Sequence, residues 1–514
     1  MKMACVAAGV LLASASTQAL AQAKDWPSYN KALDSNRYAN VSDIDPKNIA
    51  NLKVVCSYDT GEQGAFQSGL LMVDGSLYGT TEHDTFSLDP NSCKLNWRSH
   101  EDFAAGKLKV NRGVAWLEKR VFRGTTDGQV LAYDARTGKK LWATAIADAK
   151  KGESVPAAPI AWNGMVFIGT AGGDAGAVRG RMYALDATSG KVTWEFFMTG
   201  KAPGDVPRGP EAPNPQASPA KAVSGAATGG GASWSSYSLD PKTGLLYVPG
   251  ADPTTAPVAA GSGNSNEMVV LDAKTGAFQK RLRLSKHDSH HWDASSAPVL
   301  FPNRRGLRVL AATPKDGNLY LLDLADGHQI YKKPVTQQLG GEAPITTKGT
   351  RFCPGTLGGA DFNGPAFDPA ENLLLTGEVH WCSTVKAAPP GKTGAAGEQV
   401  VTMDDVKQWA GVVTASDADT GVRKWQFKTP APVISGVTAT SGRLVVFGDM
   451  AGTFYALDAL DGTKLLAKDL GGPIGGGVIA YDTNMGEKFA VAVGMVAPAW
   501  PTAKVNGKVV VLGL

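Results

Sequence analysis

The sequence predicts an all-β protein folded as an eight-bladed β-propeller. Its 514 residues include 61 glycines and 30 prolines, a composition that favours many turns over long helices. A short motif also recurs at roughly the 40- to 50-residue spacing that is typical of propeller blades. The segments between its copies are alternating or wholly apolar, as expected for strands in stacked sheets.

The first 23 residues are interpreted as a secretory signal peptide. Lys2 precedes an apolar run at 6–15, and small residues follow it as far as Ala23. This run is too short to span a bilayer and is typical of an export signal. We therefore expect a periplasmic protein with no membrane span, whose single domain covers residues 24–514.

The recurring motif has Asp at a turn, usually Gly about four residues later and an apolar or aromatic residue about four after that, as in Asp134, Gly138 and Trp142; the first copy has Cys93 at the Gly position. Asp supports the tight turn, Gly adopts the positive φ, and Trp is expected to pack on the next sheet. Seven copies predict seven blades. They start at Asp89, Asp134, Asp186, Asp272, Asp323, Asp417 and Asp458, with spacings of 45, 52, 86, 51, 94 and 41 residues.

The remaining segments complete this ring. Partial copies at Asp240 and Asp368 are expected to form inner hairpins of the two blades with long spacings. The N-terminal residues 52–55 and C-terminal residues 508–512 are expected to build the eighth blade together, and a seven-bladed ring is the alternative. Two segments rich in Pro, Ala and Gly, 201–231 and 386–399, are predicted to be irregular loops that shape an axial site.

Four cysteines follow the signal peptide, at Cys56, Cys93, Cys353 and Cys382. Export permits disulfides, and four cysteines allow three pairings. The pairing of nearest neighbours, Cys56 with Cys93 and Cys353 with Cys382, is one possibility, and four free buried thiols are another. No Cys-x-x-Cys-His motif is present, so we expect no covalently bound haem in this chain.

Charge gives no indication of a nucleic-acid partner. The formal net charge is +4, 19% of the residues are charged, and no dense Lys/Arg run occurs. Nucleic-acid-binding domains carry a basic patch or stripe that this sequence lacks. We therefore expect no nucleic acid among its partners.

The stretch 287–293 contains three of the seven histidines, two aspartates and a tryptophan. It could be a polar turn anchored by Trp292 or part of a functional site. Three other segments, 169–180, 229–234 and 250–253, place a carboxylate or a tryptophan beside glycines. Glycine lets the backbone approach a flat ligand, a carboxylate can bind a hard cation, and a tryptophan can stack on a ring.

The order of these segments resembles the quinoprotein alcohol dehydrogenases. The resemblance implies an eight-bladed propeller that holds pyrroloquinoline quinone (PQQ) and Ca²⁺, and the spacing of Cys353 and Cys382 also matches a disulfide of that family. The motifs are Val110-Asn111-Arg112-Gly113, the glycine-rich loop with Asp174, the Gly-Gly-Gly-x-x-Trp segment ending at Trp234, the Asp252-Pro253 turn and the Trp292-Asp293 pair.

The resemblance also implies a role for each matching residue. Asp293 corresponds to the general base, and Asp174 and Asp252 join it as Ca²⁺ ligands. Lys315 corresponds to a catalytic residue that donates to the quinone oxygens. The residues implied in cofactor binding are Arg112, Gly172, Gly173, Trp234, Lys315 and Asp361.

Several positions depart from the family pattern. Gly106-Lys107 replaces the usual pair of adjacent cysteines, and Pro156 replaces a cofactor-binding threonine. Gln67 replaces a residue that is often acidic. Ser295 replaces the additional aspartate of the lanthanide-dependent members, which favours calcium. The metal loop carries Asp174 where Glu is commoner.

The predicted function is therefore periplasmic oxidation of an alcohol with PQQ and Ca²⁺, with electrons passed to a separate cytochrome c or another acceptor. The substrate could be a primary, secondary or polymeric alcohol or a polyol. A non-catalytic scaffold propeller of the cell envelope is the main alternative, since a propeller alone implies no chemistry. A zinc hydrolase using His287, Asp288, His290 and His291 is disfavoured, because neighbouring residues cannot easily face one tetrahedral ion.

Overall fold

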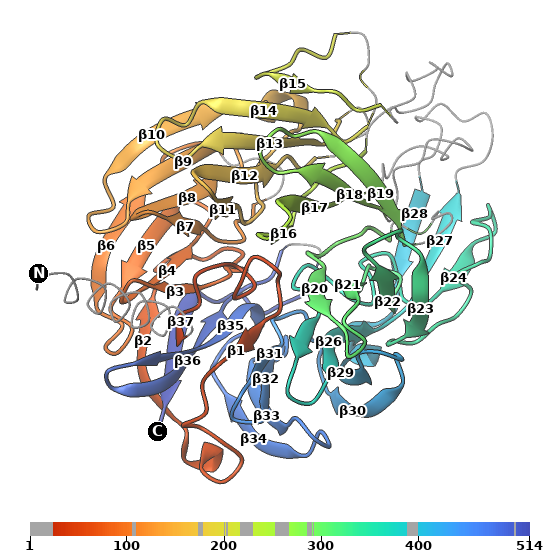
Figure 1. Ribbon diagram of the computed structural model, residues 1–514. Coiled ribbons are helices and arrows are strands. Elements are labelled where there is room, and N and C mark those ends of the chain that lie inside the picture. Colours follow the sequence, from red (N-terminus) through yellow and green to blue (C-terminus); the bar gives the residue numbers. More distant parts are fainter. Residues whose placement is uncertain are drawn as a thin grey trace, which may run out of the picture.

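The computed structural model shows a ring of small sheets, in each of which successive strands lie further from the middle of the ring (Figure 1). Apart from short helical turns at Ile49–Asn51 (η1), Ala149–Lys151 (η2) and Val406–Gln408 (η4), the described elements are β-strands. The predicted all-β class is thus confirmed. The structure describes residues 24–104, 109–172, 178–199, 201, 204–215, 230–251, 267–284, 290, 292–387, 399–497 and 500–514.

Within these residues the strands form nine sheets, eight of which have four or five strands. The first three sheets follow the chain in order, and each is antiparallel apart from β15, which adds in parallel to β14. Their strands are β3 (Leu71–Val73), β4 (Ser76–Thr80), β5 (Asp84–Leu88) and β6 (Leu95–His100); β7 (Ala115–Leu117), β8 (Arg120–Gly124), β9 (Gln129–Asp134) and β10 (Lys140–Ala145); and β11 (Ile160–Trp162), β12 (Met165–Gly169), β13 (Arg181–Asp186), β14 (Val192–Phe197) and β15 (Glu211–Ala212).

The next three large sheets include the two long motif spacings. Asp240 and Asp368 lie in the first hairpins of the sheets that contain Asp272 and Asp417, as predicted. The strands are β16 (Ser238–Asp240), β17 (Leu245–Pro249), β18 (Glu267–Asp272) and β19 (Phe278–Arg283); β20 (Val299–Pro302), β21 (Arg308–Ala312), β22 (Asn318–Asp323) and β23 (Gln329–Pro334); and β25 (Ala366–Asp368), β26 (Leu373–His380), β29 (Ala410–Asp417) and β30 (Arg423–Thr429).

A separate three-stranded sheet lies between β26 and β29 in the sequence. It consists of β24 (Thr350–Phe352), β27 (Ser383–Ala387) and β28 (Gln399–Met403). Irregular loops were predicted at 201–231 and 386–399, but the described parts of these segments include β15 and the inner ends of β27 and β28. The prediction was wrong for these few residues, because strand pairing extends into both segments, and the other described residues of 201–231 lie outside the strands.

The last two large sheets join the two ends of the described chain. β1 (Tyr38–Ala39) adds in parallel to β31, and β2 (Lys53–Asp59) pairs with β37, with Val54 opposite Leu512. The predicted sharing of one sheet by N- and C-terminal strands is confirmed. The other strands are β31 (Thr438–Thr440), β32 (Leu444–Gly448), β33 (Thr453–Asp458) and β34 (Lys464–Asp469), followed by β35 (Ile474–Thr483), β36 (Gly486–Val493) and β37 (Lys508–Gly513).

The Asp-Gly-Trp motif links each sheet to the next. Trp97 Nε1 donates to the Ala135 carbonyl at 2.8 Å, and Trp194 Nε1 donates to the Ala273 carbonyl at 2.9 Å. In both cases the acceptor directly follows the motif aspartate of the neighbouring sheet. Gly138 has a φ of 70°, and a Cβ there would lie 2.5 Å from the Trp97 ring. The predicted packing of tryptophan on the next sheet is thus confirmed.

Two disulfide bonds join Cys56 to Cys93 and Cys353 to Cys382, which is the nearest-neighbour pairing.

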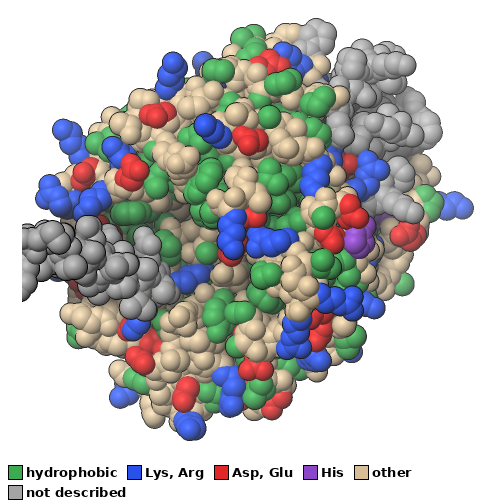
Figure 2. All heavy atoms as spheres, in the orientation of Figure 1, with side chains coloured by type: hydrophobic (Ala, Val, Ile, Leu, Met, Phe, Trp, Pro, Cys, Tyr) green, Lys and Arg blue, Asp and Glu red, His purple; other side chains and the backbone are tan. Residues whose placement is uncertain are grey.

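The surface carries mixed charge. Figure 2 shows Lys and Arg interspersed with Asp and Glu on the visible face, in agreement with the small net charge. Among the described residues, no helix has the length and apolar character needed to cross a membrane. The predicted signal peptide lies outside these residues.

Candidate active site

A cavity of about 180 Å³ gathers loops from most of the large sheets. Strands place the loops, and the loops place the side chains. The wall includes residues that follow β2, β6, β12, β15, β19, β21, β24 and β36, so it lies where the sheets converge. The lining residues are Gln67, Arg112, Ala171, Gly172, Ala232, Trp234, Asp293, Lys315, Leu357, Asp361, Phe362, Ala497 and Trp500.

An ion pair joins two of the predicted site residues. Lys315 Nζ lies 2.7 Å from Asp293 Oδ2, and the Lys315 backbone N–H donates to the Asp293 carbonyl at 3.0 Å. Asp293 is 4% exposed, so its carboxylate is removed from bulk water. The Lys315 ammonium group contacts this carboxylate at the cavity wall. Asp293 is therefore placed to act as a proton acceptor inside the cavity.

Two cations lie close to the indole of Trp234. The Arg112 guanidinium carbon is 4.7 Å from its ring centroid, and Lys315 Nζ is 5.1 Å away. Arg112 also donates to the Trp234 carbonyl at 3.1 Å and contacts the Phe362 ring. Cation–π contacts of this kind hold an aromatic face in place. An aromatic plane flanked by positive charge suits a flat anionic ligand.

Asp361 contributes a second carboxylate to the cavity. The pKa of Asp361 is raised to about 6, mainly by burial; nearby Asp293 adds to the rise, and Lys315 and Arg112 oppose it. Lys315 thus acts on both carboxylates. Below about pH 6 Asp361 is neutral and can donate a hydrogen bond, and above it the group only accepts.

Two buried polar groups in the cavity wall lack hydrogen-bond partners among the described residues. Gln67 is 1% exposed, yet neither its amide nitrogen nor its amide oxygen is bonded. Arg112 Nε is also unpartnered. Buried polar groups are normally hydrogen-bonded, so both groups point to a polar ligand in the cavity. From the sequence, Gln67 was predicted only to replace an often acidic residue, not to line the site. The polar side chain at that position was the one signal for such a role.

Gly172 reaches the cavity through a tight backbone contact. Its φ is 113°, and a Cβ there would lie 2.1 Å from the Gly152 carbonyl oxygen. Any side chain would therefore displace the backbone of the 149–152 turn. Gly172 is also the last described residue before the loop 173–177, which contains the predicted cofactor residue Gly173 and the predicted metal ligand Asp174. Both lie outside the described residues, as does Asp252.

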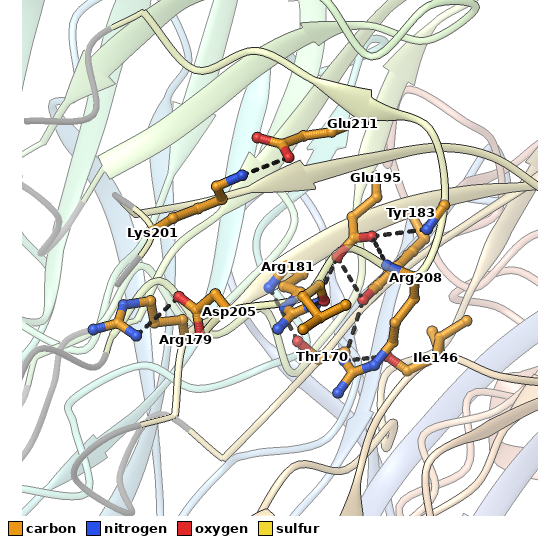
Figure 3. Close-up of polar contacts among 12 residues, drawn as sticks. Ile146, Thr170, Arg179, Arg181, Tyr183, Glu195, Lys201, Asp205, Arg208 and Glu211 are labelled. Carbon is orange, nitrogen blue, oxygen red and sulfur yellow. Dashed lines mark hydrogen bonds and ion pairs between the residues drawn. The ribbon is translucent and has the colours of Figure 1, made fainter. Parts of the chain in front are cut away.

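A buried network anchors the segments on either side of this loop (Figure 3). Arg181 pairs with Glu195 at 2.7 Å, and the Arg181 backbone N–H donates to Thr170 Oγ1 at 3.0 Å. Arg179 pairs with Asp205 at 3.0 Å. Removing one partner of a buried ion pair is costly, because the other charge stays buried. The network therefore holds the chain on both sides of the predicted metal loop.

The histidine-rich stretch serves mainly as packing in its described part. The His290 ring is 3% exposed, stacks on Trp292 at 4.6 Å and meets Phe352 edge-on at 4.4 Å. Trp292 Nε1 donates to the Gly355 carbonyl at 3.3 Å. This aromatic cluster fixes the backbone that carries Asp293. His287, Asp288 and His291 lie outside the described residues.

Six of the nine predicted site residues thus line one cavity: Arg112, Gly172, Trp234, Asp293, Lys315 and Asp361. The residues present fit PQQ, a flat acid that needs an aromatic face, cations for its carboxylates and polar partners. Trp500, Leu357 and Ala497 also line the wall. They were not predicted, because the sequence gives no signal for apolar residues brought in from distant loops.

A family model matches more than half of the chain. Residues 26–342 match the model described as "Glucose/ethanol/alcohol dehydrogenase, beta-propeller domain", named PQQ. Residues 409–493 match a second model, described as "Outer membrane protein assembly factor BamB". The second match is confined to the region of β29–β36 and includes none of the predicted site residues.

Two relatives that align with most of this chain are dehydrogenases. The lanthanide-dependent methanol dehydrogenase of Methylacidiphilum fumariolicum is 27% identical, over 89% of this chain and 82% of its own. The dehydrogenase subunit of the quinone alcohol dehydrogenase of Komagataeibacter europaeus is 28% identical, over 91% and 71%. A solved europium-containing methanol dehydrogenase superposes with a TM-score of 0.85 at 24% identity, covering 97% of this chain and all of that one. Its fold is therefore the same.

Proposed function

Because the chain belongs to the PQQ family of glucose, ethanol and alcohol dehydrogenases, we propose that its axial cavity is where an alcohol is oxidised to an aldehyde or ketone. The chain is accordingly an oxidoreductase of the quinoprotein alcohol dehydrogenase type. The observation that carries the site assignment is the convergence of Asp293, Lys315, Trp234 and Arg112 on one cavity.

Asp293 is the proposed general base. Its carboxylate lies at the cavity wall, 2.7 Å from Lys315 Nζ, where it can accept the hydroxyl proton of the alcohol. Bound PQQ would supply the hydride acceptor for the carbinol carbon. Removing the proton as the hydride leaves avoids a full positive charge on the oxidised carbon. Lys315 is also proposed to donate to the quinone oxygens.

The other described site residues are proposed to bind and orient the cofactor. Trp234 provides the stacking face, and Arg112 pairs with a cofactor carboxylate through its guanidinium group. Gly172, with Gly173, allows close backbone approach. Asp361 contributes a hydrogen bond whose direction depends on its protonation. The unpartnered amide of Gln67 supports a polar ligand in the same place.

Asp174, Asp252 and Asp293 are the proposed ligands of Ca²⁺, because hard cations prefer carboxylate oxygens. The ion would supply Lewis acidity at the quinone carbonyl. Ser295 lies two residues from Asp293 and is 1% exposed, with an unpartnered hydroxyl. A neutral hydroxyl adds no charge to the site, which supports a divalent ion over a trivalent one.

The same proposal extends to architecture, location and partner. The eight sheets of four or five strands are the eight blades of the propeller. Residues 1–23 direct export, which places the enzyme in the periplasm. A separate cytochrome c or another acceptor reoxidises the cofactor, since the chain has no haem-attachment motif.

Reconstitution tests the proposal. Protein purified without cofactor is mixed with PQQ and either Ca²⁺ or La³⁺, and both quinone absorbance and dye-linked oxidation of a panel of primary, secondary and polymeric alcohols and polyols are recorded. We expect absorbance and turnover with Ca²⁺, and the panel identifies the substrate class. Ser295→Asp should shift activity toward La³⁺. A protein that binds no PQQ with either ion would instead be a scaffold.

A further inference from the structure

Three potential metal ligands lie together outside the axial cavity. Glu62, Glu82 and His83 each offer one ligand atom, and these atoms all lie within 4.8 Å of one another. Glu62 follows β2, whereas Glu82 and His83 form the turn between β4 and β5. The group therefore spans two sheets, the one that joins the chain ends and the first sheet after it.

His83 is held in the tautomer that metal-binding histidines use. Its Nδ1 lies 3.0 Å from the Glu101 carbonyl oxygen. A carbonyl can only accept, so Nδ1 carries the hydrogen and Nε2 keeps its lone pair. The ring also packs against Phe103 at 4.6 Å and His100 at 5.8 Å, which limits its rotation.

Glu82 is a buried carboxylate without an ion-pair partner among the described residues. It is 8% exposed, and its one side-chain contact is with the Thr126 hydroxyl at a long 3.4 Å. Buried carboxylates are normally paired or bound to a metal, so Glu82 is suited to bind a cation.

We propose that Glu62, Glu82 and His83 bind one divalent ion of the zinc class at this junction. Two carboxylates and an imidazole are a ligand set for Zn²⁺ or its neighbours, whereas Ca²⁺ prefers oxygen alone. The ion would connect the segment after β2 to the turn before β5. The Cys56–Cys93 bond connects β2 to the turn after β5, so the junction would be fixed at both ends of that strand.

A second cluster provides the control. Asp323, Asp326 and His328 also place ligand atoms within 4.8 Å of one another. Here His328 Nδ1 lies 2.7 Å from Asp326, and both side chains are more than half exposed. Asp326 and His328 already contact each other and are solvated by water, so these side chains do not need a metal ion as a partner.

The test uses the full chain in millimolar Ca²⁺, which saturates any oxygen-ligand site. Zn²⁺ binding is measured by titration calorimetry, and Co²⁺ is used as a probe through its visible absorption. We expect one Zn²⁺ per chain and a Co²⁺ band that indicates a nitrogen ligand. His83→Ala and Glu82→Gln should abolish the band and weaken Zn²⁺ binding at least tenfold. His328→Ala should bind normally.

Of the three ligand variants, Glu62→Gln should disturb folding least, because Glu62 is only partly buried. It should also weaken Zn²⁺ binding, and Zn²⁺ should raise the thermal midpoint of the wild type more than that of this variant. The proposal is overturned if the wild type takes up no Zn²⁺ in the presence of Ca²⁺. It is equally overturned if His83→Ala and Glu62→Gln bind as the wild type does, or if His328→Ala alone loses the site.

Discussion

At the scale of single residues, the site depends on carboxylates whose charge is set by their surroundings. Asp293 has the Lys315 ammonium group at 2.7 Å, whereas burial raises the pKa of Asp361 to about 6. Two neighbouring carboxylates in different surroundings can take different roles. Burial also raises the pKa of Glu487, which does not line the cavity.

Asp293→Asn should abolish turnover while cofactor binding persists. The amide has nearly the same shape but cannot accept a proton, so we expect kcat to fall by about 10³-fold or more. The measurement is dye-linked alcohol oxidation beside quinone absorbance of the same reconstituted sample. Trp234→Ala is the matched comparison, because it should reduce the quinone absorbance that reports cofactor binding. Near-normal turnover of Asp293→Asn would reject the base assignment.

Glu487→Gln should remove a pH dependence from stability. Glu487 is 3% exposed and accepts the Ile44 backbone N–H at 3.0 Å, and burial raises its pKa to about 7. A raised pKa means that the folded state favours the neutral acid. Its stabilising effect is complete below about pH 4.5 and is lost as the pH rises through about 7.

Urea unfolding at several pH values measures this effect. Wild-type protein should lose on the order of 2 kcal/mol of unfolding free energy between pH 5 and 8 through this group. Glu487→Gln should show a flatter profile. Glu118→Gln, at a side chain that is 64% exposed, should leave the profile unchanged. Parallel profiles for wild type and Glu487→Gln would contradict the prediction.

Residues that correspond to family positions were predictable as site residues, and residues outside that resemblance were not. Arg112, Trp234 and Asp293 each belong to an ordered motif, and all three line the cavity. Gln67 and Trp500 reach it from loops with no recurring pattern, so only three-dimensional structure places them there. The proximity of Glu62 and Glu82 was not predictable either, because they follow strands of two different sheets.

At the scale of elements, the turn between the last two strands of a sheet determines how neighbouring sheets fit. The motif aspartate accepts from backbone N–H groups within the turn, as Asp186 does from Ser189 at 2.7 Å. The glycine then leaves room for the tryptophan of the preceding sheet. Trp142 Nε1 donates to the Ala187 carbonyl in this way at 3.2 Å.

Gly190→Ala should therefore cost more than an ordinary turn substitution. Gly190 has a φ of 72°, and a Cβ would lie 2.6 Å from the Trp142 ring. Gly164 has a φ of 76° but no atom within 4 Å of the added carbon. Gly164→Ala should cost about 1 kcal/mol for its backbone conformation. Gly190→Ala should cost about 2 kcal/mol more, because the indole must move.

Denaturant unfolding of the two variants checks this difference, and near-ultraviolet circular dichroism reports the tryptophan environment. Equal destabilisation by the two substitutions would show that the indole can move without a cost in stability.

The repeat made this packing predictable from sequence. The strands β15, β27 and β28 were not predicted, because their segments have the Pro, Ala and Gly content of loops and form strands only through neighbouring partners.

At the scale of the whole molecule, two disulfides reinforce different parts. Cys56–Cys93 joins the chain-end sheet to the first sheet, whereas Cys353–Cys382 lies beside the aromatic cluster that supports Asp293. Both close loops of moderate length, with sequence separations of 37 and 29 residues. Their stabilising effects should be similar and their functional effects different.

Replacing both Cys56 and Cys93 by serine should lower the unfolding free energy by about 3 kcal/mol and leave PQQ binding by the folded protein unchanged. The corresponding double variant at Cys353 and Cys382 should lose a similar amount and also bind PQQ more weakly. Urea unfolding and cofactor titration measure the two effects. Unchanged PQQ affinity in the second variant would show that this bond does not position the site.

The shared sheet of β2 and β37 also imposes an order on biosynthesis. A ribosome releases β2 among the first strands, but the neighbour of β2 in its sheet is β37, which emerges last. Throughout synthesis the edge of β2 would be open to wrong partners. Cys93 emerges soon after Cys56, so early oxidation could hold β2 against the first sheet until its true neighbour arrives.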